Sequence, residues 1–376
     1  MRVLHLTAGN LYGGVETYLA TLARLRHLAP VMEPAFGLCF PGRMRDELLA
    51  AGVAVHDFGP VRLSRPWTVV AARRRLRAVL AAGGFDAAVC HSSWPHGVFA
   101  PVVRRAGVWL AHAVHGDYST PNRLDRWAAR TRPDVVLANS RFTAGPAARL
   151  FPRSPVEVVY LPVERREVGD RDAVRREVRA EFGTPPGAVV ILQASRLERW
   201  KGLAVHVTAL GRLAALPGWE AWFAGGAQKA GEAEYLAELQ AAARHFGVAD
   251  RVRFLGQRAD VPRLMAAADV YCQPNTGPEP FGLAFVEALA AGLPVVTSGF
   301  GGAAEIVNDS CGVLTASGDA AEVAAVLRGL ITDPTCRAAL GAAGPGRAHE
   351  LCDPAAALAG LAAVCRPAER PVRVSS

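Results

Sequence analysis

A short loop and the apolar helix after it carry two carboxylates eight residues apart, Glu279 and Glu287. The loop Gly277–Gly282 contains two prolines and two glycines, and Glu287 is the single charged residue of the helix predicted over Leu283–Ala291. A helix N-terminus attracts phosphate or sugar oxygens because its first N–H groups lack intrahelical partners. We therefore expect a ligand with hydroxyl groups here, contacted by both carboxylates. The alternatives are that Glu279 only matches the helix dipole and that Glu287, buried in an apolar helix, has an internal partner.

A second loop carries two cations five residues apart, Arg196 and Lys201, directly after an apolar run at 189–194 that predicts a strand. Arginine offers a planar fork of donors and lysine a mobile point charge, and both suit phosphate oxygens. The pair predicts a diphosphate site at the start of the next helix, with ordinary surface charge as the alternative.

The loop after the first predicted strand contains Gly13 and Gly14. It lacks the G-x-G-x-x-G spacing of dinucleotide-binding loops, which argues against a nicotinamide enzyme. Paired glycines allow the backbone to approach a ligand closely, although they could also form a simple turn.

His115 follows an apolar run at 109–114 that predicts a strand, and ligand sites form where parallel strands end. A structural histidine paired with Asp117 is the alternative. Three further histidines have no carboxylate or cysteine set beside them, so the sequence predicts no metal site; these are His91, His96 and His112.

The elements that must position these residues alternate between strands and helices, a pattern typical of parallel sheets covered on both faces. Strands are predicted at 3–7, 85–90, 109–114 and 135–138 in a first half, and at 189–194, 221–224, 252–255, 269–273 and 294–298 in a second. Helices are predicted at 15–28 and 203–216, and the charged segment 164–187 is read as a linker or a domain-edge helix. The fold class is therefore α/β, with two Rossmann-like doubly wound domains in series. In such pairs ligands bind between the carboxyl ends of the two sheets.

Composition narrows the classes of protein. The 376 residues include no apolar run long enough to span a membrane, and the seven cysteines lack metal-ligand spacing, which predicts a cytoplasmic protein with reduced thiols. The net charge is +8, with a dense cluster at 73–77. We read this cluster as the solvated face of a helix, with contact to an anionic membrane at the inner membrane face as the alternative. No nucleic-acid partner is expected, because aromatic residues do not interleave with the basic ones.

The chain resembles the retaining glycosyltransferases of family 4, which have the GT-B fold, two Rossmann-like domains facing each other across a cleft. Its most specific motif is Glu-x7-Glu, here EPFGLAFVE at 279–287, continued by ALAAGLPVV. The supporting strings are GGVE at 13–16, SRLERWKG at 195–202, ANSRF at 138–142 and GFGGAAEIV at 299–307.

The resemblance implies the following organisation and roles. Residues 1–165 would bind the acceptor, 166–352 would bind the nucleotide-sugar donor, and 353–376 would form a helix that crosses back to the first domain, and a tail. Catalytic roles would fall to His115, Glu279, Arg196 and Lys201. Donor binding would involve Gly13, Gly14, Arg196, Lys201 and Glu279, the amides of Phe281, Gly282 and Leu283, and the Glu287 carboxylate on the ribose.

The implied activity is transfer of a hexosyl group from a UDP- or GDP-sugar to an acceptor hydroxyl, with retention of configuration and without a metal or other cofactor. The acceptor would be a small molecule, a lipid-linked sugar or a glycan. Two alternatives stay open: a nucleotide-sugar epimerase of the same fold and a non-catalytic protein that binds nucleotide sugars.

Overall fold

The computed structural model describes residues 1–366, which fold into two compact units. Unit 1 comprises Met1–Pro162 together with the segment from Cys352, and unit 2 comprises Val163–Leu351. No helix in residues 1–366 is both long and apolar enough to cross a membrane.

Unit 1 is built on a seven-stranded sheet in which every pairing is parallel, in the order β3-β2-β1-β4-β5-β6-β7. The strands are β1 (Arg2–Leu6), β2 (Glu33–Leu38), β3 (Ala54–Asp57), β4 (Ala87–His91), β5 (Trp109–Val114), β6 (Val135–Ala138) and β7 (Val156–Val158). The helices are α1 (Gly14–Arg24), α2 (Arg43–Ala50), α3 (Pro66–Gly83), α4 (Ser93–Arg105), α5 (Arg123–Ala128), α6 (Arg141–Leu150) and α15 (Pro354–Cys365), with a 3₁₀ turn at Arg26–Leu28.

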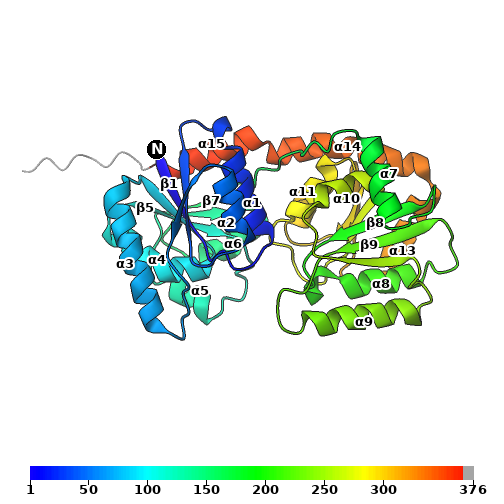
Figure 1. Cartoon of the computed structure of the whole chain (residues 1–376), viewed down its shortest axis with the longest axis horizontal. Coiled ribbons are helices and arrows are strands. Elements are labelled where there is room, and N and C mark those ends of the chain that lie inside the picture. Colours follow the sequence, from blue (N-terminus) through cyan, green and yellow to red (C-terminus); the bar gives the residue numbers. More distant parts are fainter. Residues whose placement is uncertain (367–376) are drawn as a thin grey trace, which may run out of the picture. The chain divides into compact units, whose positions relative to one another are not determined.

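Helices cover both faces of this sheet, as strands that are apolar on both sides require. Leu4 and Leu6 of β1 face α3 and α4 in one buried cluster. Figure 1 shows α1 and α15 on the other side of the sheet from α3 and α4, and α15 contacts the 3₁₀ turn after α1. The basic cluster at 73–77, predicted to form the solvated face of a helix, lies on α3, and Leu76 and Leu80 of the same helix are buried.

Unit 2 has a six-stranded parallel sheet in the order β10-β9-β8-β11-β12-β13. Its strands are β8 (Val189–Ala194), β9 (Trp219–Ala224), β10 (Val252–Gly256), β11 (Val270–Gln273), β12 (Val295–Ser298) and β13 (Gly312–Thr315). Its helices are α7 (Arg171–Glu181), α8 (Leu203–Gly211), α9 (Glu232–His245), α10 (Val261–Ala267), α11 (Leu283–Ala290), α12 (Ala303–Ile306), α13 (Ala320–Thr332) and α14 (Pro334–Cys352), with a 3₁₀ turn at Arg199–Lys201. In Figure 1, α8 and α9 lie on one side of the sheet and α7, α10 and α11 on the other.

The predicted α/β fold class, with two Rossmann-like doubly wound units, is confirmed by these two parallel sheets. Both sheets reverse strand order at one point, between β1 and β4 in unit 1 and between β8 and β11 in unit 2. In open α/β sheets, ligands bind outside the carboxyl ends of the strands at such a switch point. The loops after these four strands are therefore the first places to look for a site.

Candidate functional site

The switch point of unit 2 brings together the loops after β8 and β11. The loop after β8 carries Arg196 and Lys201, and the loop after β11 carries Glu279. A parallel bridge between Glu279 and Gly301 adds the loop after β12. Three of the residues that the sequence analysis singled out thus lie together at the carboxyl ends of the central strands of one sheet.

Two glycines let these loops approach one another closely. Gly202 has a φ of +71°, and a Cβ atom there would lie 1.8 Å from the carbonyl oxygen of Pro274. Gly301 has a φ of +74°, and a Cβ atom there would lie 2.6 Å from the carbonyl oxygen of Glu279. Both positions need a residue without a side chain, so backbone contacts fix the Lys201 and Glu279 loops in place.

Lys201 and Glu279 form a buried ion pair. The Lys201 Nζ lies 2.6 Å from Glu279 Oε2, and the side chains are only 14% and 10% exposed. The amides of Asn275 and Gln273 also donate to Glu279 Oε2, at 3.1 and 3.3 Å. A buried carboxylate is stable when several donors satisfy it, so this network sets the position of the Lys201 ammonium group.

Asn275 and Gln273 belong to the candidate site through their bonds to Glu279, and the sequence interpretation missed both. They are 2% and 1% exposed, and the Tyr271 hydroxyl donates to Gln273 Oε1 at 2.9 Å. The signal was present, because Gln273 is the polar last residue of the otherwise apolar strand β11 and Asn275 follows it in the loop that leads to Glu279.

Arg196 is paired with Glu198, whose carboxylate lies 2.8 Å from the guanidinium. Glu198 also contacts Lys229 at 2.9 Å and accepts a hydrogen bond from the Trp200 indole at 3.0 Å. Burial favours a higher pKa for Glu198, but the Lys229 hydrogen bond and the Arg196 charge outweigh it and lower the pKa. Glu198 lies inside the SRLERWKG string, yet the sequence interpretation gave it no role.

Helix α11 presents a narrow accessible face. Phe285, Val286, Ala288 and Leu289 are buried, whereas Leu283, Ala284 and Glu287 are partly exposed. The alternative of a buried Glu287 is therefore wrong, and its contact with a ligand stays a prediction. It lies one turn after Leu283, on the face that the core does not cover. Gly282 caps the helix with a φ of +110°, and both Phe281 and Gly282 are buried.

In unit 1, the paired glycines start α1 beside the switch point. Gly13 is the N-cap of α1, and its N–H donates to the Glu16 carboxylate at 3.0 Å. Gly14 is exposed, and a Cβ atom there would meet nothing within 4 Å. Internal packing therefore does not explain why Gly14 is a glycine.

His115 lies just after β5 and joins a row of histidines. Its Nε2 is 2.9 Å from Nδ1 of His91, and His91 Nε2 is 3.0 Å from Nδ1 of His5. Burial lowers the pKa of His115 to about 4. The alternative that Asp117 pairs with His115 is wrong, because the Asp117 carboxylate accepts hydrogen bonds from the backbone and hydroxyl of Ser119.

The other two histidines lie on the opposite face of the sheet. His96 Nε2 bonds to the Thr131 carbonyl at 2.8 Å, and His112 Nε2 bonds to the Tyr118 hydroxyl at 3.0 Å. Across residues 1–366, no group of three or more His, Cys, Asp and Glu residues is arranged to hold a metal ion.

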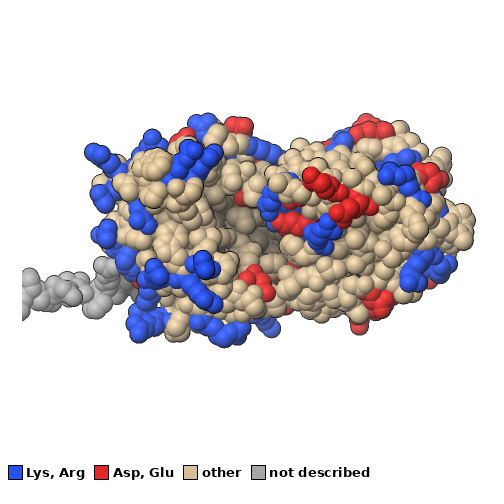
Figure 2. All heavy atoms as spheres, turned by 90° about the horizontal axis from the view of Figure 1, so that it is seen from below, with Lys and Arg blue, Asp and Glu red and all other residues tan. Residues whose placement is uncertain are grey.

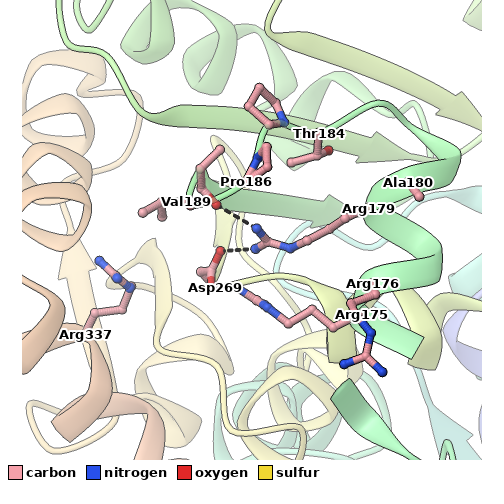
Figure 3. A pocket seen from close by; sticks show the side chains of 12 residues that line it. Arg175, Arg176, Arg179, Ala180, Thr184, Pro186, Val189, Asp269 and Arg337 are labelled. Carbon is pink, nitrogen blue, oxygen red and sulfur yellow. Dashed lines mark hydrogen bonds and ion pairs between the residues drawn. The ribbon is translucent and has the colours of Figure 1, made fainter. Parts of the chain in front are cut away.

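A pocket of about 450 Å³ lies at the opposite edge of the unit 2 sheet, where β8 and β11 begin. Figure 3 shows Arg179 bridging Asp269 and the start of β8. Arg175 and Arg179 lie 2.6 and 2.5 Å from the Asp269 carboxylate, and both also donate to the Ala267 carbonyl. These arginines anchor α7 to the sheet, and none of the predicted site residues lines this pocket.

Comparison with known proteins identifies two matching family profiles and several relatives. The family profile described as Glycosyltransferase Family 4 matches residues 12–167, and that of Glycosyl transferases group 1 matches residues 174–347. The chain is 36% identical to the phosphatidyl-myo-inositol mannosyltransferase of Mycolicibacterium smegmatis, over 90% of this chain and 86% of that protein. It is 31% identical to the D-inositol 3-phosphate glycosyltransferase of Salinispora arenicola, over 71% of this chain and 65% of that protein.

Coverage of the curated relatives varies: for three of them, the aligned segment spans only 27%, 48% and 65% of the relative's length. Among solved structures, Anabaena HepE in complex with UDP and glucose superposes with a TM-score of 0.83 at 26% identity, covering 97% of this chain and 98% of that one. The two profiles together with the mycobacterial relative show that the chain belongs to glycosyltransferase family 4.

Proposed function

We propose that the protein transfers a hexosyl group from a UDP- or GDP-sugar to an acceptor hydroxyl, with retention of configuration. The observation that carries this proposal is the meeting of Arg196, Lys201 and Glu279 at the switch point of unit 2, where nucleotides bind in such sheets. HepE, which shares the fold at 26% identity, was solved with UDP and glucose. Unit 2 is accordingly the proposed donor-binding unit and unit 1 the proposed acceptor-binding unit.

In the proposed reaction, the bond from the anomeric carbon to the phosphate oxygen breaks and its electron pair stays on the diphosphate. The acceptor oxygen attacks from the same face, and its proton passes to the leaving phosphate. Arg196 and Lys201 stabilise the negative charge that develops there. Glu279 contacts the sugar besides orienting Lys201, which it contacts at 2.6 Å.

Further contacts with the donor follow from the accessible face of α11. Glu287 is partly exposed one turn into the helix, where it can bind the ribose hydroxyls. The amides of Phe281, Gly282 and Leu283 surround the start of α11, where the helix dipole favours phosphate. From unit 1, Gly13 and Gly14 approach the phosphates and His115 contacts the reacting sugar.

The reaction is proposed to need no metal, because the cations of Arg196 and Lys201 supply the charge that a metal would otherwise provide. Activity measured with EDTA should equal activity without it. Loss of activity that Mg²⁺ or Mn²⁺ restores would contradict this point.

The acceptor is proposed to be a small molecule, a lipid-linked sugar or a glycan. Two relatives are named for transfer to inositol-containing acceptors, so inositol phosphates and phosphatidylinositol are the first acceptors to test. Cytoplasmic location is part of the proposal, and its support is that all seven cysteines are free.

Contact with an anionic membrane is the second part of the location. Figure 2 shows Lys and Arg side chains spread over the visible face of unit 1, with few acidic ones. On α3, Arg74 and Arg77 are exposed, and Trp67 is 67% exposed at the start of the helix. Sedimentation with phosphatidylglycerol vesicles should therefore exceed that with phosphatidylcholine vesicles. Changing Arg74 and Arg77 to Glu should remove the difference, and an unchanged difference would refute the α3 contact.

The central test is a panel of UDP- and GDP-hexoses incubated with the protein, first without and then with acceptors. Slow release of nucleoside diphosphate from one donor, accelerated by an acceptor, supports transfer. Appearance of an epimeric donor would instead identify an epimerase, and binding without any turnover would identify a non-catalytic protein. Product NMR then decides retention from the anomeric coupling.

A further inference from the structure

Three histidines from three different elements form one row under α1. His5 comes from β1, His91 from the end of β4 and His115 from the loop after β5. Neighbouring rings lie with centroids 5.3 and 5.2 Å apart and planes within 26° of parallel. The hydrogen bonds of 3.0 and 2.9 Å always join Nδ1 of one ring to Nε2 of the next.

The two hydrogen bonds of the row must point in the same direction, because each ring carries one proton and can donate only one bond. Burial lowers the pKa of His5 to about 3 and that of His115 to about 4, and the pKa of His91 lies well below its ordinary value. All three are therefore neutral at neutral pH, and a neutral imidazole has one N–H and one bare nitrogen. Two arrangements remain: either every Nδ1 carries the proton, or every Nε2 does.

The buried end of the row distinguishes the two arrangements. His5 Nε2 is buried and has no hydrogen-bond partner. If every Nε2 carried the proton, this atom would be an orphaned buried N–H, which is rare in native structures. If every Nδ1 carries it, His5 Nε2 is a bare lone pair.

Two other buried histidines of the chain show which nitrogen carries the proton when the other nitrogen has no hydrogen-bond partner. His206 Nδ1 contacts the Gln193 amide oxygen at 2.9 Å, and His96 Nε2 contacts the Thr131 carbonyl at 2.8 Å. Both partners only accept, so these nitrogens carry the protons, and the unpartnered buried nitrogens, His206 Nε2 and His96 Nδ1, are bare. A buried nitrogen without a partner is thus the bare one in both rings.

The other end of the row is open to a ligand. His115 is only partly buried, and within residues 1–366 its one hydrogen bond is the bond to His91. Its Nδ1 is therefore the nitrogen that remains for a ligand.

The backbone at His91 is also unusual. Ser92, the next residue, has a φ of 77° and a ψ of 172°, and it is the only non-glycine residue in the described chain with a positive φ. Its N–H donates to the Ala113 carbonyl on β5 at 2.9 Å. Such conformations persist only where the surroundings impose them, and they cluster at functional sites.

We propose that His91, supported by His5, is a positioning residue that fixes the proton of His115 on Nδ1, so that His115 donates a hydrogen bond to the bound substrate. His115 then serves a sugar hydroxyl, ring or phosphate oxygen as a donor and does not act as a base toward it. This inference rests on the proposed function only for the identity of the ligand, because the proton position is a property of the free protein.

The test reads the tautomer directly from the ¹⁵N shifts of histidine-labelled protein. The chain has ten histidines, and the His115 signals are assigned by their loss in His115→Asn. We expect a protonated Nδ1 and a bare Nε2 at neutral pH. A protonated Nε2 on His115 overturns the inference, whether or not the protein transfers sugars.

Two variants separate positioning from packing. In His91→Asn the amide nitrogen takes the place of Nδ1 and can still donate to His115, so the tautomer and turnover should be kept within a few fold. His91→Leu removes this donor: the tautomer should become mixed and kcat should fall about 10–100-fold, with a much smaller change in donor KM. His96→Leu is the matched control, a buried histidine on the other face of the sheet that should lower stability and leave the His115 tautomer unchanged. Equal kcat losses in His91→Asn and His91→Leu, with the His115 tautomer unmoved in both, would reduce His91 to a packing role and refute the proposal.

Discussion

The Lys201–Glu279 pair permits a stability prediction that does not depend on knowing the substrate. At 2.6 Å and an effective dielectric constant of about 20, the attraction is about 6 kcal/mol, much of which offsets the cost of removing both charges from water. Lys201→Met leaves the Glu279 carboxylate buried with only the amides of Asn275 and Gln273. We expect a loss of about 3–5 kcal/mol in the free energy of unfolding of unit 2.

The decisive comparison is the double variant. Adding Glu279→Gln to Lys201→Met removes the uncompensated charge and keeps a side chain that the two amides can bond. The double variant should therefore be more stable than Lys201→Met alone. Native-state hydrogen exchange of the β8 and β11 amides reports unit 2 separately from unit 1.

A control for burial is available in the same unit. Arg199 and Glu238 lie 2.7 Å apart, nearly the same distance, but their side chains are 67% and 53% exposed. Arg199→Met should leave exchange in β8 and β11 indistinguishable from the wild type, because solvent screens the pair. The reasoning fails if Lys201→Met behaves like this control, or if adding Glu279→Gln lowers stability further.

Three more predictions concern other parts of the chain. In the proposed reaction the Arg196 charge acts on the departing diphosphate, so Arg196→Ala should lower kcat about 100–1000-fold, whereas Glu287→Gln should mainly raise donor KM. Steady-state kinetics on folded variants would contradict these roles by showing the reverse pattern. Ser92→Gly should raise the stability of unit 1 by about 1 kcal/mol. The variant relieves backbone strain of about 1–3 kcal/mol, and the greater backbone entropy of glycine in the unfolded chain offsets part of this gain. Faster amide exchange in β4 would show that Ser92 is not strained. Leu358→Ala on α15 should destabilise unit 1 by about 2–5 kcal/mol, because Leu358 is fully buried, and an unchanged thermal transition would mean that α15 is not part of the fold.

The sequence predicted the central strands of both sheets well. The strands at 109–114, 135–138 and 189–194 have the predicted bounds, because each is a largely apolar run buried on both faces. The strands it missed lie toward the sheet edges: β2 contains Pro34, and β3, β7 and β13 are only three or four residues long. An edge strand pairs with a neighbour along one side only, and a strand of three or four residues is too short to show a clear apolar pattern. The charged segment at 164–187 contains α7, one of the two structures expected for it.

For the candidate site, the sequence singled out charged residues that the structure brings together, but it did not predict how they pair. The spacing of Arg196 and Lys201 says nothing about a bond between Lys201 and Glu279, which are 78 residues apart in the chain. The roles of Asn275 and Gln273 likewise depend on β11 lying beside β8. Tertiary pairing of this kind is set by strand order, which a single sequence does not contain.

The pairing also affects how the proposed donor site would bind its ligand. Each of the two cations already has a carboxylate within 3 Å, Glu198 for Arg196 and Glu279 for Lys201. The site is therefore not a cluster of unpaired positive charges. A simple phosphate gains little binding energy there, because it competes with the two carboxylates for the cations. A donor whose sugar and nucleoside bind elsewhere on the same edge can bring its diphosphate close enough to share these cations. In the proposed reaction, the negative charge that grows on the leaving phosphate would make that sharing strongest in the transition state, which is where binding energy accelerates a reaction.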